Sequence, residues 1–264
     1  MDKIEIKVLE THGDPGQWCA FLARLTQRGH NIKSMDDLEE LFNKEHSPGL
    51  IGSIAKMPHG TIKRFAPITI AIVGASRRFL AQARTSQVGT NFVSASLQYS
   101  DYSGEADFVV PYALYEKRMQ DPTVNWPKLY VASCRDSMAT YSFLAEHVDN
   151  DTAGYAASQG LRNILVMKGN HQSWDYWIRM RSCNRNTVET QYVTLRIWEE
   201  LLKTPYGQEF FGYSGPDCMH GACKEGKMCC GNPMRWYYKM AQTENRPVPR
   251  VIIDEKWPLL NKEN

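Results

Sequence analysis

GNHQSWDYWIRMRSCNRNTVETQ, residues 169–191, is the most informative stretch of the chain. Trp174, Trp177 and Arg181 recur in it at helical spacing, so they share roughly one side of a predicted helix. Its polar side chains are mostly amide and guanidinium donors: Asn170, Gln172, Arg179, Arg181 and Arg185. Arginine suits bidentate binding of phosphate, so the pattern indicates an anion site. The alternative is a solvated amphipathic helix whose tryptophans lie in the core and whose arginines pair with acidic residues of the same stretch.

Regular structure is predicted on both sides of this helix. The helical pattern continues to about Leu202, with a break near Asn184–Asn186. Upstream, residues 161–167 (LRNILVM) fit a short strand or the end of a helix, and residues 110–160 read as helices with polar faces. Residues 65–73 (FAPITIAIV) have high β propensity and are apolar on both faces, which predicts a strand buried on both sides.

The first third of the chain mixes strands with helices. Residues 4–10 (IEIKVLE) alternate between apolar and charged, which is typical of a half-buried strand. Helices are predicted over residues 16–28 and Asp36–Phe42, and another begins at Ser76. Residues 93–102 (VSASLQYSDY) fit a strand and turn. Strands that precede many helices without strict alternation favour an α+β fold over a doubly wound α/β fold.

The composition is that of an ordinary globular chain. Of 264 residues, 42% are hydrophobic and 23% charged, and the net charge is +2. These values argue against disorder and against a polybasic coat for nucleic acid or membrane. No apolar run approaches the roughly 18–20 residues of a membrane span, and the charged N-terminus does not resemble a signal peptide. Seven cysteines without a secretion signal favour reduced thiols, so we expect a cytoplasmic protein.

The common local signatures of nucleotide and hydrolase sites are missing, but sparser patterns remain. His59 and Thr61 precede the predicted buried strand, where they could reach a ligand or cap a turn. Farther on, a helix with Gln82 and Arg84 runs into small polar side chains: Thr85, Ser86, Gln87, Thr90, Asn91, Ser94, Ser96 and Gln98. Such a stretch suits a polar, planar ligand such as a nucleobase or an isoalloxazine ring. The alternative is a polar loop followed by the wet face of an edge strand.

Four cysteines gather near the C-terminus. Cys218, Cys223, Cys229 and Cys230 fall within 13 residues, with His220 between them. Thiolates and imidazoles bind Zn²⁺ or a cluster, although the spacing is not that of a CxxC pair. A disulfide or a plain reduced loop are the alternatives. The tail, residues 245–264, contains three prolines and is predicted to be a surface arm.

The order of these motifs resembles the flavin-dependent thymidylate synthase (ThyX) family. PHGTIKRF at 58–65 resembles the family's "GHxSxxEH"-like strand entry, and residues 74–99 resemble the helix that leads into its motif RHRxxSxNExSxRY. LRNIL at 161–165 resembles "ARxxLP". Residues 169–191 resemble "GNYRAWxxFxxMRxxxHAxxEIR" without a gap. The resemblance spans about residues 4–203.

The signature motif departs from the family pattern. In an ungapped register Gln82 keeps the family's glutamine, and Thr85, Ser86 and Gln87 replace Arg-His-Arg. A register shifted by one makes Arg84 the first arginine and keeps Asn91 as the motif asparagine. Both registers remain open from the sequence.

Other departures fall at neighbouring positions. Ser96 and Tyr99 keep their places in the family motif, whereas Gln98 replaces its arginine. In the late helix Gln172 stands for an arginine, and Arg185 stands for a histidine that the family places near the folate.

The resemblance implies a ThyX-like single domain over residues 1–210, with a central, mostly antiparallel sheet and long helices. Residues 211–264 would be a Cys-rich C-terminal extension. It also implies a homotetramer with FAD sites between subunits, and no protein nucleophile. By position, the FAD contacts would be His59, Thr61, Arg84, Thr85, Ser86, Gln87, Asn91, Asn170, Gln172 and Arg181. The nucleotide contacts would be Gln82, Ser96, Gln98, Arg162 and Arg181, with Arg185 on the folate side.

The implied reaction is reductive methylation of dUMP at C5 to dTMP, with NADPH and methylenetetrahydrofolate as co-substrates. Two hypotheses compete with it. One is a related methylase or hydroxymethylase of another pyrimidine nucleotide, such as UMP. The other is a non-catalytic nucleotide- or metal-binding protein in which Cys218, Cys223, Cys229 and Cys230 are the candidate ligands.

Overall fold

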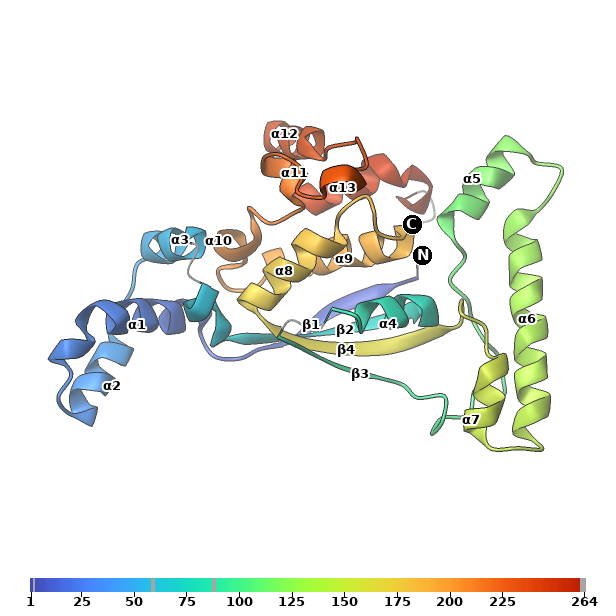
Figure 1. Cartoon of the computed structure of the whole chain (residues 1–264), viewed down its shortest axis with the longest axis horizontal. Helices are drawn as coiled ribbons and strands as arrows, with labels where there is room; N and C mark the ends of the chain where they lie inside the picture. Colours follow the sequence, from blue (N-terminus) through green and yellow to red (C-terminus); the bar gives the residue numbers. More distant parts are fainter. Residues whose placement is uncertain (2, 58–59, 87–88, 262–264) are drawn as a thin grey trace.

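The computed structural model describes residues 1, 3–57, 60–86 and 89–261. Its sheet has four antiparallel strands in the order β1-β2-β4-β3, with helices packed on one side (Figure 1). The strands are β1 (Glu5–Thr11), β2 (Pro67–Ser76), β3 (Thr90–Ser94) and β4 (Arg162–Asn170). This arrangement confirms the predicted α+β fold with a central antiparallel sheet.

The helices account for most of the remaining chain. The α-helices are α1 (Pro15–Arg28), α2 (Met35–Asn43), α3 (Pro48–Lys56), α4 (Arg77–Ala83), α5 (Tyr112–Gln120), α6 (Trp126–Ala145), α7 (Asn150–Ala153), α8 (His171–Arg181), α9 (Val188–Leu202), α10 (Gly207–Phe211), α11 (Asp217–His220), α12 (Arg235–Glu244) and α13 (Val248–Lys256). Short 3₁₀ helices are η1 (Gly29–Asn31), η2 (Gly60–Arg64), η3 (Gly154–Ala156), η4 (Gly226–Met228) and η5 (Pro258–Asn261). The predicted break between two late helices and the helix beginning after Ser76 are confirmed. Of residues 161–167, for which a strand or the end of a helix was expected, residues 162–167 belong to β4.

The central strand β2 is buried on one face only. Ile68, Ile70 and Ile72 are fully buried beneath the helices. Successive side chains of a strand point to opposite faces, so Val73 points away from the helices and is 42% exposed. The same face carries Ile164 of β4, 47% exposed, and Val93 of β3, 72% exposed. The predicted burial on both sides is therefore wrong for this single chain.

Helix α8 is fixed to the sheet by its tryptophans and by its first turn. Trp174 and Trp177 are buried, and the Trp174 indole N–H donates to the Ile68 carbonyl oxygen at 3.1 Å. At the helix start, Asn170 Oδ1 accepts a hydrogen bond from the backbone N–H of Ser173 at 2.9 Å. The helical spacing read from the sequence therefore places the tryptophans in the core and orients the polar side of α8.

A buried carboxylate joins α9 to the start of α4. Glu189 accepts hydrogen bonds from the backbone N–H of Ser76 at 2.7 Å and from its hydroxyl at 2.5 Å. Burial raises the pKa of Glu189, although these two hydrogen bonds oppose the shift. Glu189 thus holds α9 against the start of α4 and does not neutralise the arginines of α8.

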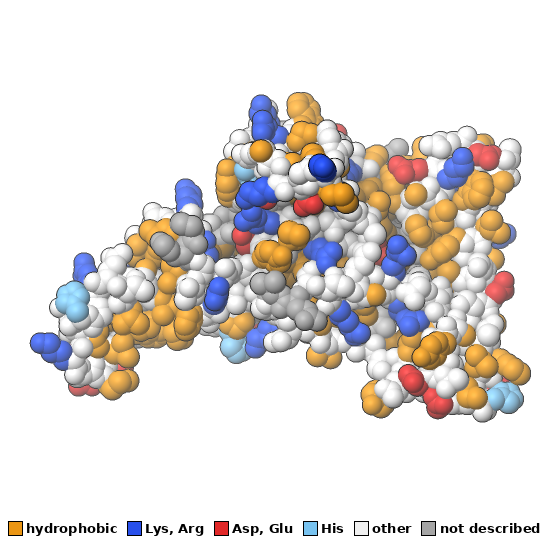
Figure 2. Space-filling model, viewed as in Figure 1, with side chains coloured by type: hydrophobic (Ala, Val, Ile, Leu, Met, Phe, Trp, Pro, Cys, Tyr) orange, Lys and Arg blue, Asp and Glu red, His pale blue; other side chains and the backbone are white. Residues whose placement is uncertain are grey.

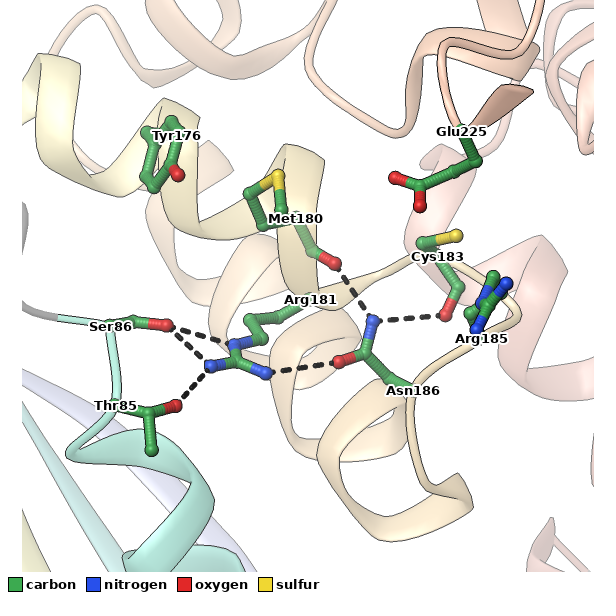
Figure 3. A pocket seen from close by; sticks show the side chains of 9 residues that line it. All are labelled: Thr85, Ser86, Tyr176, Met180, Arg181, Cys183, Arg185, Asn186 and Glu225. Carbon is green, nitrogen blue, oxygen red and sulfur yellow. Dashed lines mark hydrogen bonds between the residues drawn. The ribbon is translucent and has the colours of Figure 1, made fainter. Parts of the chain in front are cut away.

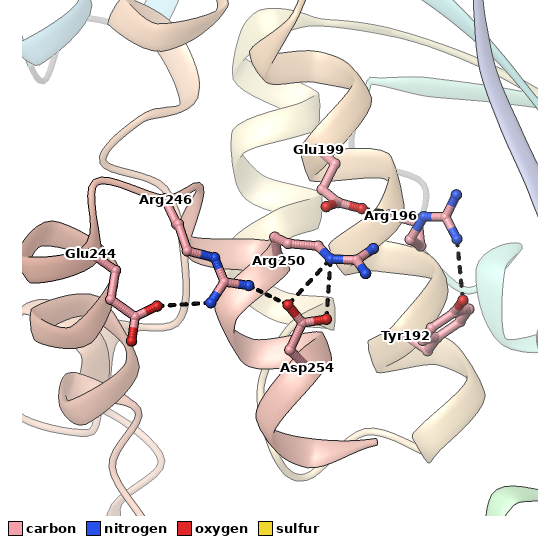
Figure 4. Close-up of polar contacts among 7 residues, drawn as sticks. All are labelled: Tyr192, Arg196, Glu199, Glu244, Arg246, Arg250 and Asp254. Atoms are coloured by element: carbon pink, nitrogen blue, oxygen red, sulfur yellow. Dashed lines mark hydrogen bonds and ion pairs between the residues drawn. The ribbon is translucent and has the colours of Figure 1, made fainter. Parts of the chain in front are cut away.

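The C-terminal helices pack on α9. Val251, Ile252 and Ile253 of α13 are buried in the main hydrophobic core, so the predicted surface arm at 245–264 is wrong over this helix. Its apolar residues recur at helical spacing, a signal that the three prolines obscured. Arg246 and Arg250 both pair with Asp254, and Arg246 also pairs with Glu244 (Figure 4).

Helices α5, α6 and α7 form a lobe at one end of the sheet (Figure 1). This lobe has its own apolar cluster, which includes Phe108, Met138, Tyr141 and Leu161. None of the described helices is long and apolar enough to cross a membrane.

His171 is buried without a charged partner and should make folding sensitive to acid. It is 3% exposed, stacks on Phe211, and its Nδ1–H donates to the Ala66 carbonyl oxygen at 2.9 Å. Burial, chiefly, lowers the pKa of His171 to about 4 from 6.5. Below pH 6.5 His171 is therefore protonated in the unfolded chain, whereas in the folded chain it stays neutral until the pH nears 4. The contribution to stability is complete above pH 6.5 and is lost as the pH falls toward 4.

We expect His171→Phe to remove this dependence. Between pH 7 and pH 4.5, urea unfolding should show the wild type losing about 2–3 kcal/mol more stability than the variant. His30→Gln, at an exposed position, should retain the wild-type dependence. Parallel stability curves for wild type and His171→Phe would contradict the assignment.

Candidate functional site

The C-terminal end of α8 meets the segment that follows α4. The Arg181 guanidinium donates from Nε to Ser86 Oγ at 2.9 Å and from Nη2 to Thr85 Oγ1 at 2.7 Å. Nη2 also reaches Ser86 Oγ at 2.6 Å and the Gln82 carbonyl oxygen at 3.2 Å. Nη1 donates to Asn186 Oδ1 at 3.3 Å. Residues nearly one hundred positions apart are thus joined around one cation (Figure 3).

The charge of Arg181 is held by neutral groups. In the described part of the chain no carboxylate pairs with it, and all its hydrogen-bond acceptors are hydroxyl, amide or carbonyl oxygens. Burial lowers the pKa of the Arg181 guanidinium from its ordinary value, and the guanidinium lies 5.8 Å from the Trp177 ring. An arginine fixed in place without a counter-charge, beside two hydroxyls, is suited to bind an anion such as phosphate.

A pocket of about 310 Å³ opens beside this arginine. Its size is at the lower end of the range for small-molecule sites. The lining residues are Thr85, Ser86, Tyr176, Met180, Arg181, Cys183, Arg185, Asn186 and Glu225. Lys and Arg outnumber Asp and Glu over the middle of the molecular face that carries α8 and α4 (Figure 2). The pocket therefore combines an apolar side, two arginines, one carboxylate and neutral hydrogen-bonding groups.

The other predicted cofactor residues of this helix lie at its beginning. Asn170 caps α8, and Gln172 Oε1 accepts a hydrogen bond from Arg64 Nε at 2.5 Å. Thr61 is exposed on η2, the same short helix as Arg64. A Cβ atom on Gly60 would lie 2.2 Å from Gln172 Nε2, so a larger residue at position 60 would require the Gln172 amide to move.

The residues around Gln172 and those around Arg181 lie at opposite ends of α8. Its 11 residues span about 16 Å at 1.5 Å per residue. An elongated ligand could contact both ends of such a strip.

Described residues on both sides of the gap between α4 and β3 contact this helix. Gly89 has a φ of +65°, and its carbonyl oxygen accepts a hydrogen bond from Ser173 Oγ at 3.1 Å. Arg84 donates to Ser94 Oγ and is exposed, and Asn91 is exposed on β3. Neither side chain lines the Arg181 pocket.

Several predicted nucleotide residues lie elsewhere in the single chain. Arg162 donates to the Gly74 carbonyl oxygen at 2.7 Å and pairs with Asp107 at 3.1 Å. Ser96 Oγ accepts a hydrogen bond from the backbone N–H of Gln98, whose side chain is exposed. None of these three residues lines the Arg181 pocket.

The remaining predicted positions divide between described and undescribed residues. Gln82 reaches Arg181 through its carbonyl oxygen, while its side-chain Oε1 accepts hydrogen bonds from the hydroxyls of Thr187 and Thr190. Arg185 lines the pocket and donates to the Met228 carbonyl oxygen. His59 and Gln87 lie outside the described residues.

The sequence patterns missed five lining residues: Tyr176, Met180, Cys183, Asn186 and Glu225. Tyr176 and Met180 could have been found, because they lie on the same predicted helix at a spacing of four residues. Glu225 had no such signal, because it comes from a Gly- and Cys-rich loop whose position depends on tertiary contacts.

The cysteines remain free thiols throughout the chain. Cys183 comes from the connection between α8 and α9, and it lines a second cavity of about 170 Å³ together with Cys218 and Cys223. Burial, chiefly, raises the pKa of the Cys183 thiol. In the ranges that the structure describes, no three His, Cys, Asp or Glu side chains are placed to hold one metal ion. Cys218, Cys223, Cys229 and Cys230 thus form no metal centre in this conformation.

Comparison with known proteins identifies related enzymes. The flavin-dependent thymidylate synthase of Clostridium tetani is 21% identical over 247 residues, covering 86% of this chain and 93% of the relative. The enzyme of the same name from Geobacter sulfurreducens is 23% identical over 234 residues, covering 86% and 94%.

Solved structures share the fold. ThyX from Helicobacter pylori, complexed with FAD and dUMP, gives a TM-score of 0.59 at 16% identity, over 80% of this chain and 99% of that one. The UMP/dUMP methylase PolB from Streptomyces cacaoi, bound with 5-Br dUMP, gives 0.60 at 12% identity, over 81% and 98%.

A family model described as thymidylate synthase complementing protein matches residues 7–204. This match includes the sheet, α8 and α9, and therefore every element that positions Arg181. Because the match covers well over half of the 264 residues, the chain belongs to the thymidylate synthase complementing protein family.

Proposed function

We propose that this protein is a flavin-dependent enzyme that reductively methylates dUMP at C5 to give dTMP. FAD would be its cofactor, with NADPH and methylenetetrahydrofolate as co-substrates. The observation that carries the proposal is Arg181, a fixed cation without a carboxylate partner among the described residues, beside the hydroxyls of Thr85 and Ser86. Its family membership supplies the class of reaction.

The donor set along α8 fits a phosphate-bearing, elongated cofactor. Arg181, Thr85 and Ser86 offer charge and hydroxyl groups at one end, and Thr61 and Gln172 offer neutral polar groups at the other. FAD would supply the electrons for the reduction, while these residues would bind and orient it. We therefore retain the predicted FAD contacts, including Arg84, Asn91 and Asn170, as part of the proposal.

The substituted motif is compatible with binding through a different set of groups. Where the family has Arg-His-Arg, Thr85 and Ser86 accept hydrogen bonds from Arg181 instead of providing charge. The positive charge of the site thus comes from α8. We propose that Arg181 compensates for the missing motif arginines.

A second candidate is methylation of UMP. The fold neighbour PolB is named a UMP/dUMP methylase, and the pocket carries a carboxylate, Glu225, that can accept a hydrogen bond from a ribose hydroxyl. Comparing UMP, dUMP and dCMP as substrates would distinguish the two reactions.

We also propose that the protein is a homotetramer. Val73, Val93 and Ile164 share the face of the sheet opposite the helices and are 42%, 72% and 47% exposed. Exposed aliphatic side chains on one face typically mark a contact surface. A second copy covering this face would bring Arg162, Ser96 and Gln98 of one chain toward a shared nucleotide site.

The boundary and the compartment stay predictions. We keep residues 1–210 as the catalytic domain and 211–264 as an extension, although both contribute to the main hydrophobic core. The cytoplasmic location expected from the cysteines is likewise a proposal.

Replacing Arg181 tests the anion site directly. Arg181→Met should weaken dUMP binding to the FAD-loaded protein about 10- to 100-fold, because a charge-assisted hydrogen bond is worth about 1.5–3 kcal/mol. The dUMP affinity of Arg181→Lys should lie between those of the wild type and Arg181→Met, since lysine keeps the charge but not the planar donor geometry. Titrating the flavin absorption bands with dUMP measures the change.

Arg179→Met is the matched control for this experiment. Arg179 lies on the same helix but pairs with Asp217 at 2.5 Å, so its loss should change dUMP affinity less than threefold. Equal losses for both variants would mean that Arg181 acts only through general charge. Tritium release from C5-labelled dUMP, with NADPH and methylenetetrahydrofolate, then tests turnover, and its absence with every pyrimidine nucleotide would overturn the proposed reaction.

The open sheet face predicts a change of oligomeric state on mutation. Val93→Lys should convert the tetramer to smaller species, because it places a charge within the proposed contact. Phe143→Lys, at a 63% exposed position on α6, should leave the tetramer intact. Sedimentation velocity measures both, and an unchanged tetramer for Val93→Lys would exclude this face as the interface.

A further inference from the structure

One wall of the Arg181 pocket comes from outside the segment that matches the family. Glu225 lines the pocket, whereas the family match ends at residue 204. In Figure 3 Glu225 lies on the side of the pocket away from Thr85 and Ser86, with Arg181 between them. The C-terminal extension thus adds a carboxylate to a pocket that is otherwise cationic and neutral.

The position of Glu225 is fixed by contacts of the surrounding loop. Arg185 donates to the Met228 carbonyl oxygen, and Asn184 Nδ2 donates to the Asn232 carbonyl oxygen at 3.0 Å. These bonds attach the loop to the connection between α8 and α9. The backbone N–H of Met228 donates to the Glu225 carbonyl oxygen at 2.9 Å, which closes η4 just after Glu225. The carboxylate is therefore presented by an anchored turn.

The Glu225 side chain is available to a ligand. It is exposed, and across the described ranges it forms no ion pair and no side-chain hydrogen bond. Arg185, which also lines the pocket, is engaged with a backbone carbonyl oxygen. A carboxylate accepts hydrogen bonds and repels anions, so this wall selects donor groups and not phosphate.

The two walls together select a molecule with an anion at one end and hydroxyl donors at the other. Arg181, a predicted contact of both FAD and the nucleotide, suits the 5′-phosphate of a nucleotide. A carboxylate that accepts a hydrogen bond from a ribose 2′-hydroxyl is the pairing used in dinucleotide-binding folds. Tyr176 and Met180 provide the apolar side against which a planar base could lie.

We propose that Glu225 accepts a hydrogen bond from the ribose 2′-hydroxyl of a uridine nucleotide whose phosphate is bound by Arg181, so that the pocket takes UMP as well as dUMP. This inference rests on the proposed function, because it uses the same pocket and the same nucleotide class. It assigns sugar recognition to a residue of the C-terminal extension.

Calorimetric titration of the FAD-loaded protein with UMP and with dUMP, at one salt concentration, tests the assignment. Glu225→Ala should weaken UMP binding about 10- to 100-fold and change dUMP binding less than threefold, because only UMP loses a hydrogen bond to a charged group. Glu225→Gln keeps a neutral hydrogen-bond acceptor and should therefore lose less UMP affinity than Glu225→Ala does. Lys227→Ala, an exposed position in the same loop that does not line the pocket, should bind both nucleotides as the wild type does.

The outcomes separate this inference from the proposed function. If wild type binds dUMP but not UMP, or if Glu225→Ala weakens both nucleotides equally, the 2′-hydroxyl assignment is wrong and the proposed function stands. If the FAD-loaded wild type binds neither nucleotide, the proposed function fails and this inference fails with it. A loss of UMP affinity without a loss of dUMP affinity, seen in Glu225→Ala and not in Lys227→Ala, would establish the 2′-hydroxyl assignment.

Discussion

The packing of α8 against β2 determines where the functional groups of this protein lie. Trp174 donates its indole N–H to the Ile68 carbonyl oxygen, and this bond fixes both the height and the rotation of the helix on the sheet. Two turns later, the same rotation directs Arg181 toward the segment after α4. A buried indole left without its acceptor would cost more than the bond itself contributes, so the orientation is strongly specified.

Arg181 in turn orders the loop that it contacts. Thr85 and Ser86 have short side chains and could adopt many local hydrogen bonds, but both accept from the one guanidinium. The cation is stabilised by neutral dipoles and keeps its charge available to a ligand, because no described carboxylate cancels it. Of the acidic residues in the same stretch, Glu189 holds the N-terminus of α4, and Asp175 accepts a hydrogen bond from the Ser214 hydroxyl.

The sequence predicted those features that depend on local periodicity. The tryptophan spacing predicts the buried side of α8. The predicted helix start at Ser76 is confirmed, and the Ser76 hydroxyl accepts a hydrogen bond from the backbone N–H of Phe79. The one-sided burial of β2 was not predictable, because an apolar strand looks the same whether its second face meets helices or another subunit. Glu225 was not predictable either, because only long-range contacts such as Asn184 to Asn232 place its loop beside α8.

In the proposed homotetramer, the polar residues of one chain would form only part of the site. Arg162 lies where β4 begins, whereas Arg181 lies at the far end of α8, which follows the other end of that strand. The helix-free face carries the exposed aliphatic side chains of Val73, Val93 and Ile164, whose apolar area water does not favour. The same face also carries the exposed polar side chains of Lys168 and Asn91. Covering that face with another copy, as proposed, would remove the apolar area from water and place a second set of polar residues beside the first. The same contact would then stabilise the assembly and complete the nucleotide site, so assembly and binding would be coupled.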